Sequence, residues 1–400
     1  MRRIWVLMAV AFVDMIGLMM IVPLLPLYAK SLGAAPVAIG FLAAAFPIAQ
    51  LASSPVWGRV SDKKGRRPAL LIGLAGSAVA YVIFGFADAL WLLFLSRFAQ
   101  GLGGGTTGVA QAYVADTVAP NERAKALGWL SAATSAGVII GPGLGSLAHN
   151  LGSAAPALIA AGLIVINLGF AWRWLPESRR QPAPAPAGAS PAPRKSRPIA
   201  HAVWEVARHP ARPVSRLIWI YAIAMLPYNA VGLVFSLYLS ERFAITENEI
   251  GFFFMAFGAV GVIMRIFVVG WMNDRLGEVR TMRLGATLYA LGFLTIPLAG
   301  SLPVFVLCQL LLPLGTALLF PANSALVSHR AHQEELGLTL GVQQTFRGVS
   351  AIVGPILAGL AYQGLGPTVP FFAAGAIVVG ALILAVREPN PVAVTEPVRA

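Results

Sequence analysis

The stretch Gly58-Arg-Val-Ser-Asp62-Lys-Lys-Gly65-Arg66-Arg67 returns later in the chain as Gly270-Trp-Met-Asn-Asp274-Arg-Leu-Gly277-Glu-Val-Arg280. The shared frame, Gly-x-x-x-Asp-x-x-Gly, recurs at an offset of 212 residues, from 58 to 270. A second pattern, Gly137-x-x-x-Gly141-Pro142-x-x-Gly145, returns as Ser350-x-x-x-Gly354-Pro355-x-x-Ala358 at an offset of 213 residues. Two motifs in the same order at nearly one spacing predict a duplicated chain with two similar halves.

The regions between these motifs are strongly apolar. Hydrophobic residues make up 58% of the 400 positions and charged residues only 11%, against about a quarter charged in soluble domains. Apolar runs of about 20 residues recur, which is the length that a helix needs to cross about 30 Å of hydrocarbon. We therefore expect an all-α integral membrane protein with twelve transmembrane helices in two six-helix bundles. The expected spans are 4–29, 37–58, 69–87, 90–115, 125–148, 154–175, 214–240, 248–272, 281–299, 303–328, 335–362 and 368–386.

The formal net charge of +13 is placed unevenly. Nearly all Lys and Arg residues lie in every second loop along the chain, on one side of the membrane. Only Lys30 and Arg242 lie in the loops on the opposite side. By the positive-inside rule the basic loops and both termini are cytoplasmic, and this distribution favours a lipid bilayer rather than nucleic acid as partner. We expect an N-terminal bundle (1–175), a Pro/Ala-rich cytoplasmic linker (176–213), a C-terminal bundle (214–387) and a cytoplasmic tail (388–400). Within the linker, residues 201–209 favour a short amphipathic surface helix.

Several kinds of chemistry find no support in the sequence. Cys308 is the only cysteine, which excludes an intrachain disulfide and a cysteine metal site. Neither an HExxH pair nor a GxSxG nucleophile elbow occurs, and the loop histidines His329 and His332 are too few to favour a metal site. Gly103-x-Gly105-x-x-Gly108 matches a dinucleotide-binding pattern but lies in an apolar run with no preceding strand. We expect no enzyme activity, no cofactor and no metal.

The motifs resemble those of the major facilitator superfamily, and within it the twelve-span drug:proton antiporters that include tetracycline efflux pumps. The loop from Gly58 to Pro68 is similar to the loop signature of the superfamily, and the pattern from Gly137 to Gly145 resembles its antiporter-associated motif. Two further likenesses are Arg97-x-x-Gln100-Gly101 in the fourth span, and Asp14 followed by Pro23 and Pro26 in the first. The second half departs from these patterns, with Gln309 at the position of Arg97 and Ser350 at that of the first glycine. The resemblance implies efflux of a small amphipathic molecule across a bacterial inner membrane, in exchange for protons and by alternating access; we expect a monomer.

Asp14 is the candidate proton carrier. It lies about ten residues into the first span, or about 15 Å along a helix, close to the bilayer centre. A carboxylate there costs about 2.5 to 3.5 kcal/mol on insertion scales and normally faces a cavity or a partner. The alternative is a carboxylate held ionised in a structural ion pair or hydrogen-bond network. The resemblance also assigns Arg97 to proton coupling; the alternative is an arginine that snorkels from the outer third of its span.

The other polar residues within the spans are candidates for the substrate cavity, and each is equally a candidate for an interhelical hydrogen bond. Arg265 and Arg347 are further charged residues far inside the expected spans. For each, two roles stay open: binding an anionic substrate, or holding the helices of the bundle together. The candidate cavity residues are Gln100, Gln50, Tyr113, Tyr228, Asn229, Gln309, Asn323, Gln343 and Arg347, with Tyr28, Gln111 and Gln344 as additional polar positions.

The basic loop after the second span is a candidate gate. Asp62 is placed to cap or face the positive end of a helix start, and Arg66 to reach a carboxylate such as Asp116. In the family that the loop resembles, this cluster ties the two halves together in the outward-facing state. The gating candidates are Gly58, Asp62, Gly65, Arg66, Asp116 and Asp274. The antiporter motif, which consists of Gly137, Gly141, Pro142 and Gly145, predicts close helix packing and a bend.

Two other functions stay open from the sequence. One is proton-coupled transport of a metabolite such as a sugar, an amino acid or a siderophore. The other is a receptor or scaffold without transport, although such a protein has no use for charged residues inside several spans.

Overall fold

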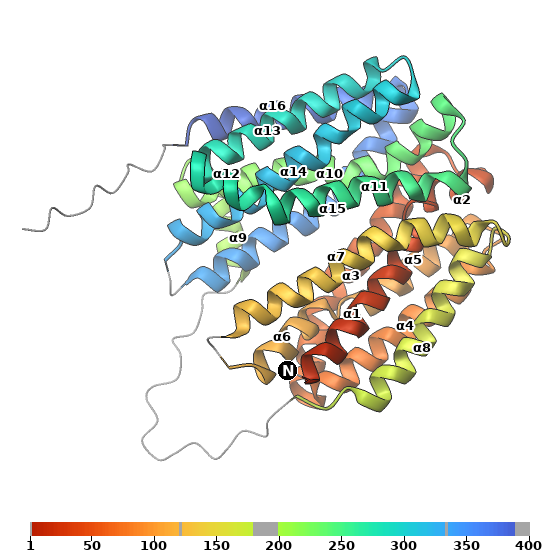
Figure 1. Ribbon diagram of the computed structural model, residues 1–400. Helices are drawn as coiled ribbons and strands as arrows, with labels where there is room; N and C mark the ends of the chain where they lie inside the picture. The colour runs from red at the N-terminus through yellow and green to blue at the C-terminus, as the bar shows by residue number, and fades with distance from the viewer. Residues whose placement is uncertain (1, 120–121, 179–198, 333–334, 389–400) are drawn as a thin grey trace, which may run out of the picture. The chain divides into compact units, whose positions relative to one another are not determined.

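The computed structural model describes residues 2–119, 122–178, 199–332 and 335–388, and every regular element in these ranges is helical (Figure 1). Ten helical stretches of this part are long and apolar enough to cross a membrane. The prediction of an all-α, multi-pass membrane protein is therefore confirmed. The ten stretches are Ile4–Ser31, Pro36–Lys64, Arg66–Gly85, Lys125–His149, Ala155–Trp174, Pro213–Phe243, Glu247–Phe267, Leu302–Arg330, Leu336–Leu365 and Val369–Val386.

Apart from residues 175–198, which separate α8 from α9, the helices follow one another with short connections. In the first half they are α1 (Arg2–Ile21), α2 (Leu25–Ser31), α3 (Pro36–Lys64), α4 (Arg66–Gly85), α5 (Leu90–Gly104), α6 (Thr107–Thr117), α7 (Arg123–His149) and α8 (Ala155–Trp174). After them come α9 (Ile199–Arg208), α10 (Pro213–Phe243), α11 (Glu247–Phe267), α12 (Val269–Leu276), α13 (Glu278–Thr295), the 3-10 turn η2 (Ile296–Leu298), α14 (Leu302–Arg330), α15 (Leu336–Leu365) and α16 (Val369–Val386). The expected linker helix at 201–209 is thus α9, and 179–198 and 389–400 lie outside the described residues.

Two expected spans, 90–115 and 281–299, are not among the ten stretches. The first is divided between α5 and α6 at Gly105 and Thr106, where α3 passes so close that a Cβ on Gly105 would lie 2.5 Å from the Ser53 hydroxyl. The dinucleotide-like glycine pattern lies at this break and serves helix packing. The second span corresponds to α13, whose first turns carry Glu278, Arg280 and Arg283 and so lower its mean hydropathy.

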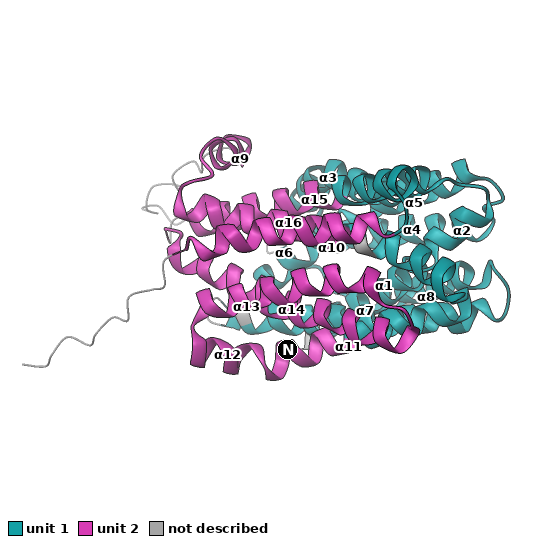
Figure 2. Ribbon diagram, turned by 90° about the horizontal axis from the view of Figure 1, so that it is seen from above, with its two compact units in different colours: residues 1–192, 230–258, 352–367 teal, residues 193–229, 259–351, 368–400 magenta. Residues whose placement is uncertain are grey.

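The chain forms two compact units, coloured separately in Figure 2. Unit 1 comprises Met1–Ala192, Ala230–Gly258 and Ile352–Pro367; unit 2 comprises Pro193–Asn229, Ala259–Ala351 and Thr368–Ala400. In unit 1, α1 packs on α7 and α8, and α4 packs on α5 and α8; in unit 2, α13 packs on α14 and α16. The expected domain bounds at 175, 213 and 387 stay a prediction.

Unit 1 includes parts of α10, α11 and α15, which pack closely on its N-terminal helices. A Cβ on Gly359 would lie 2.5 Å from the Pro36 carbonyl oxygen, and one on Gly40 would lie 2.6 Å from that of Pro355. Lys30 forms an ion pair of 2.8 Å with Glu241, whose other carboxylate oxygen accepts a hydrogen bond from Tyr362. These contacts join the ends of the helices that lie away from the basic loops.

The repeated loop adopts the same backbone conformation twice. Gly65 (φ 106°, ψ 159°) links α3 to α4, and Gly277 (φ 77°, ψ 157°) links α12 to α13. This region of φ and ψ is open essentially to glycine alone. The offset of 212 residues in the sequence is therefore also a repeat of local structure.

Candidate functional site

Asp14 is half-buried in α1 and makes no hydrogen bond or ion pair with any described residue. Gly17, one turn further along α1, packs against the ring of Tyr81 in α4 and the side chain of Ile164 in α8. Asp14 and Arg97 are both within electrostatic range of the Tyr81 hydroxyl. Because Asp14 has no fixed cation, it can exchange a proton without breaking an ion pair.

Arg97 in α5 is buried, with 4% of its surface exposed. Its Nη1 donates to the Gln100 side-chain oxygen, and its guanidinium carbon lies 5.0 Å from the centre of the Phe46 ring. The Nε atom of Arg97 and the Nε2 atom of Gln100 have no partner among the described residues. The head group is therefore held inside unit 1 and does not extend to water, and it retains unused donors beside Tyr81.

Tyr81 was missed by the sequence reasoning. It is 2% exposed and lies among Asp14, Arg97 and Gln100. A tyrosine in an apolar run gives no signal of its own, because aromatic residues are common throughout these spans. Only its placement on α4, opposite α1 and α5, brings it into the cluster.

The antiporter motif positions the helix that carries Asp14. A Cβ on Gly137 would lie 2.7 Å from the Phe12 carbonyl oxygen, and one on Gly141 would lie 2.6 Å from the Met19 Cβ. A Cβ on Gly145 would overlap with the Met20 carbonyl oxygen. The three glycines, four residues apart, thus form one face of α7 that lies directly on the α1 backbone.

Pro142 in the same motif contacts a different helix. Its carbonyl oxygen lies against Gly251 of α11, and the Ser146 hydroxyl one turn later accepts the Gly251 N–H at 2.8 Å and donates to the Glu247 carbonyl oxygen at 2.6 Å. The motif therefore joins α7 both to α1 and to the first turns of α11.

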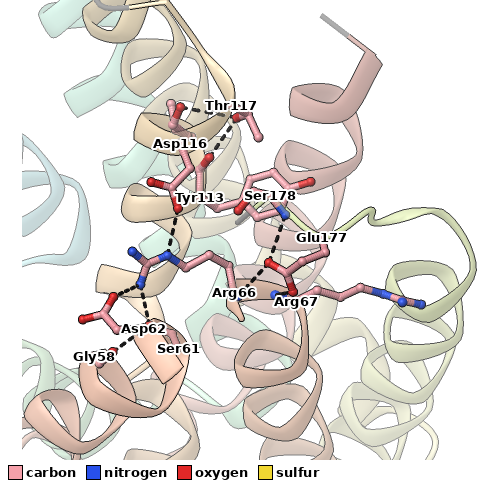
Figure 3. Close-up of polar contacts among 11 residues, drawn as sticks. Gly58, Ser61, Asp62, Arg66, Arg67, Tyr113, Asp116, Thr117, Glu177 and Ser178 are labelled. Carbon is pink, nitrogen blue, oxygen red and sulfur yellow. Dashed lines mark hydrogen bonds and ion pairs between the residues drawn. The ribbon is translucent and has the colours of Figure 1, made fainter. Parts of the chain in front are cut away.

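Arg66 connects the ends of three helices at the basic loop (Figure 3). Its Nε donates to Asp116 of α6 at 2.9 Å, and its Nη1 donates to Asp62 of α3 at 2.5 Å and to the Ser61 hydroxyl at 2.7 Å. The expected contact of Arg66 with Asp116 is therefore present, and Asp62 is a second acidic partner that was not expected. Every one of these partners belongs to unit 1.

Glu177, which follows α8, was also missed by the sequence reasoning. Its carboxylate accepts the backbone N–H groups of Arg66 at 2.9 Å and Arg67 at 3.1 Å, and so caps the start of α4 (Figure 3). Asp62 was expected to face a helix start, but it pairs with Arg66 instead, because Glu177 occupies the cap. The Gly65 Cα faces this carboxylate so closely that a Cβ would lie 2.8 Å from the Glu177 Cδ.

The second copy of the loop carries a different pair. Glu278 stands at the position of Arg66 (offset 212), and His329 at the position of Asp116 (offset 213). The His329 Nδ1 atom lies 3.2 Å from a Glu278 carboxylate oxygen. The second half therefore has an acidic residue where the first has a basic one, and a basic residue where the first has an acidic one. Asp274, at the position of Asp62, is exposed and has no ion-pair partner among the described residues.

Unit 2 also has a buried carboxylate, Glu388, which is 1% exposed. Arg216 of α10 and Arg330 of α14 both donate to it, and Arg283 of α13 donates to backbone carbonyl oxygens at the end of α16, including that of Ala385 at 3.1 Å. Glu388 lies 211 residues after Glu177. A glutamate two or three residues after the last helix of each half is the sequence feature that the two sites share.

Five of the remaining cavity candidates donate a hydrogen bond to a neighbouring group. Backbone carbonyl oxygens accept four of these bonds: Gly104 from Gln50 (3.0 Å), Pro176 from Tyr113 (2.8 Å), Met225 from Asn229 (2.8 Å) and Leu217 from Asn323 (3.0 Å). Gln343 donates to the Asn323 side-chain oxygen at 3.3 Å. Gln309 is buried, and its Oε1 has no partner among the described residues. Tyr228 and Arg347 are exposed, and Arg347 donates only to Gln344, at 3.3 Å.

Comparison with known proteins identifies relatives over almost the whole chain. The family model described as Major Facilitator Superfamily matches residues 7–230 and 217–399. The chain is 30% identical to the class D tetracycline resistance protein of Salmonella ordonez, over 97% of this chain and 98% of that protein. It is 29% identical to multidrug resistance protein 2 of Bacillus subtilis (strain 168), over 94% and 92%. Among solved structures, a bacterial homologue of the human lysosomal transporter Spinster shares the fold, with a TM-score of 0.77, 13% identity, and coverage of 96% of this chain and 95% of that chain.

Proposed function

Because this chain belongs to the major facilitator superfamily, we propose that it exports a small amphipathic drug across the bacterial inner membrane in exchange for protons. Membership of this family makes the chain a transporter of small molecules and not an enzyme. The names of the tetracycline and multidrug resistance relatives support drugs as the substrates. Proton exchange is supported above all by Asp14. This half-buried carboxylate lies in a membrane-spanning helix and has no ion-pair partner in the described part of the chain.

The proposed topology has twelve spans, with both termini and the linker on the cytoplasmic side. The broken helix α5–α6 then forms the fourth span and α13, with η2, the ninth. This topology is supported by the two basic loops at 58–67 and 270–280, which share one backbone conformation at Gly65 and Gly277. We propose that the protein works as a monomer whose halves alternate in exposing a central substrate site.

In this mechanism Asp14 is protonated from outside and releases the proton inside. A carboxyl group in a low-dielectric site prefers its neutral form, so loading a proton removes a charge from the interior. Arg97 and Gln100 keep unused donors beside Tyr81, which supports a role for these three residues in stabilising the carboxylate once the proton has left. The face of α7 that carries Gly137, Gly141 and Gly145 holds α1 in place while this occurs.

The Arg66 cluster is the proposed cytoplasmic gate. Arg66 joins α3, α4 and α6 through Asp62 and Asp116, and Glu177 fixes the start of α4. Opening requires these charge-assisted contacts to rearrange, and hydrogen bonds to charged groups contribute about 1.5 to 3 kcal/mol each. Gly65 supplies the backbone turn that brings Arg66 and Glu177 together.

The proposed function is tested with inverted membrane vesicles from cells that express the full chain and lack their own pumps. Vesicles are energised and offered a panel of tetracyclines, cationic dyes, anionic dyes and metabolites, with and without an uncoupler. Uptake of at least one drug that stops when the uncoupler is added supports the proposal. Uptake of metabolites alone contradicts drug efflux, and uptake that survives the uncoupler contradicts proton exchange.

A further inference from the structure

Arg265 of α11 and Arg347 of α15 lie in the parts of these helices that belong to unit 2, and neither has an acidic partner in the described part of the chain. Arg347 is about eleven residues into α15, or about 17 Å along the helix. Arg265 precedes Asp274 at the cytoplasmic loop by about nine residues of helix, or about 14 Å. Both side chains are exposed. The Nη1 of Arg347 donates to Gln344 at 3.3 Å, and Arg265 makes no hydrogen bond or ion pair among the described residues.

No carboxylate of unit 2 is available to them within the membrane. The residue ranges 214–229, 259–273, 279–331, 336–351 and 368–387 contain no Asp and no Glu. Guanidinium groups keep their charge in proteins, and an unpaired cation at membrane depth is costly. These two arginines therefore need an anion or water beside them in every state of the protein.

The same unit shows how its structural polar residues behave. Asn323 is fully buried, donates to the Leu217 carbonyl oxygen at 3.0 Å and accepts a hydrogen bond from Gln343 at 3.3 Å. Interhelical hydrogen bonds of this kind lock helices together. Arg265 and Arg347 differ in both respects: both side chains are exposed, and among the described residues their one hydrogen bond is that from Arg347 to Gln344, on the same helix.

The two arginines lie on turns that flank one aromatic cluster. The turn of α15 that carries Arg347 is joined to α10 beside Tyr221, where the Ser350 hydroxyl donates to the Ala222 carbonyl oxygen at 2.9 Å, and Met264, next to Arg265, packs against Leu318 of α14. Both arginines are within electrostatic range of the Tyr221 hydroxyl. Tyr221 packs edge-on against Phe320 of α14 with ring centres 5.2 Å apart, and Tyr228, which is 46% exposed, packs against the same ring at 5.8 Å. The surface thus combines two fixed cations with an accessible aromatic ring.

From these contacts we propose that Arg265 and Arg347 form an anion-binding site, and that the transported molecule is an anionic amphipath. Its acidic group, such as a carboxylate or a sulfonate, binds the two guanidinium groups, which suit planar anions. Its rings pack on Tyr228 and the neighbouring aromatic side chains. This inference rests on the proposed transport function and names the class of substrate.

Two dyes of one ring system and opposite charge test this inference: anionic fluorescein and cationic rhodamine 123. Binding to the purified full-length protein in micelles of uncharged detergent is measured by fluorescence anisotropy, without any proton gradient. We expect fluorescein to bind more tightly than rhodamine 123. Arg265→Gln and Arg347→Gln should each weaken fluorescein binding by about tenfold to a hundredfold, and Arg347→Lys should restore part of the loss at that position. The control Arg242→Gln, at an exposed position in the last turn of α10, should bind like the unaltered protein.

Equal fluorescein affinity in the double Gln variant and the unaltered protein would overturn the inference. So would tighter binding of rhodamine 123 by the unaltered protein, a comparison that needs no variant to fold. The outcome is separable from that of the proposed function. Anion binding without uncoupler-sensitive efflux supports the site and contradicts the transport mechanism, whereas proton-driven efflux of cations by a protein that binds no anion does the reverse.

Discussion

Single glycines set the geometry of the basic loop. Gly65 combines a backbone conformation restricted to glycine with direct contact between its Cα and the Glu177 carboxylate. Gly277 has the same conformation with open space around it, and Gly58 is an ordinary helical residue, also with open space around it. The three positions therefore separate backbone strain from side-chain clash.

We expect Gly65→Ala to destabilise the protein by more than Gly277→Ala. Backbone strain in this region costs about 1 to 3 kcal/mol in both variants, and only Gly65→Ala also displaces Glu177 from the two N–H groups that it caps. Gly58→Ala should be neutral or slightly stabilising, since alanine favours a helix over glycine by about 1 kcal/mol. Melting temperatures of the purified variants in one detergent check this order. A melting temperature for Gly65→Ala equal to that of Gly58→Ala would contradict it.

At the scale of the helix, the antiporter motif is a packing surface between α7, α1 and α11. The resemblance to antiporters assigns the motif a meaning in transport, and the geometry supplies a physical reason for it. Asp14 lies on the segment of α1, from Phe12 to Met20, that the three glycines contact. Any displacement of α7 is therefore transmitted to the proposed proton carrier.

Gly141→Ala should displace α1 and lower proton-driven transport. Its new Cβ would lie 2.6 Å from the Met19 Cβ and 2.9 Å from the Ile16 carbonyl oxygen, and overpacking of this kind costs about 1 to 3 kcal/mol. Gly162→Ala in α8 is the matched control, since its Cβ would meet nothing within 4 Å. Transport per folded molecule is measured for both variants in vesicles. Loss of transport in the control to the same extent would show that helix glycines matter for some other reason.

The two basic loops differ in the kind of pair that they hold. Arg66 pairs with Asp116 through a guanidinium, whereas the Glu278–His329 pair is an ion pair only while the imidazole is protonated. An exposed pair of this kind contributes about 0.2 to 1 kcal/mol.

His329→Arg should raise the melting temperature of the purified protein slightly, because a guanidinium keeps its charge in proteins and can donate two hydrogen bonds to the Glu278 carboxylate. His332→Arg, three residues away, controls for added positive charge. Equal melting temperatures of His329→Arg and His332→Arg would contradict the proposed pairing of this position with Glu278.

At the scale of the whole chain, much of the architecture was predictable, because a bilayer constrains both the length of the apolar segments and the side on which basic loops lie. The Gly-x-x-x-Asp-x-x-Gly repeat predicted two similar loops, and Gly65 and Gly277 adopt one conformation as a result. The break between α5 and α6 was not predicted, since hydropathy does not register how closely α3 approaches Gly105. Composition also gave no reason to select Tyr81, Glu177 or Glu388, whose importance depends on contacts between distant segments.

We propose that Asp14 exchanges a proton in each transport cycle. Each proton that moves through 100 mV contributes about 2.3 kcal/mol, enough to sustain a substrate gradient of about fiftyfold. The direct measurement uses purified protein in liposomes, comparing accumulation driven by an imposed proton gradient with substrate exchange at zero gradient. We expect Asp14→Asn to keep exchange and lose gradient-driven accumulation, while Asp88→Asn, in an exposed loop, keeps both. Full accumulation by Asp14→Asn would contradict it.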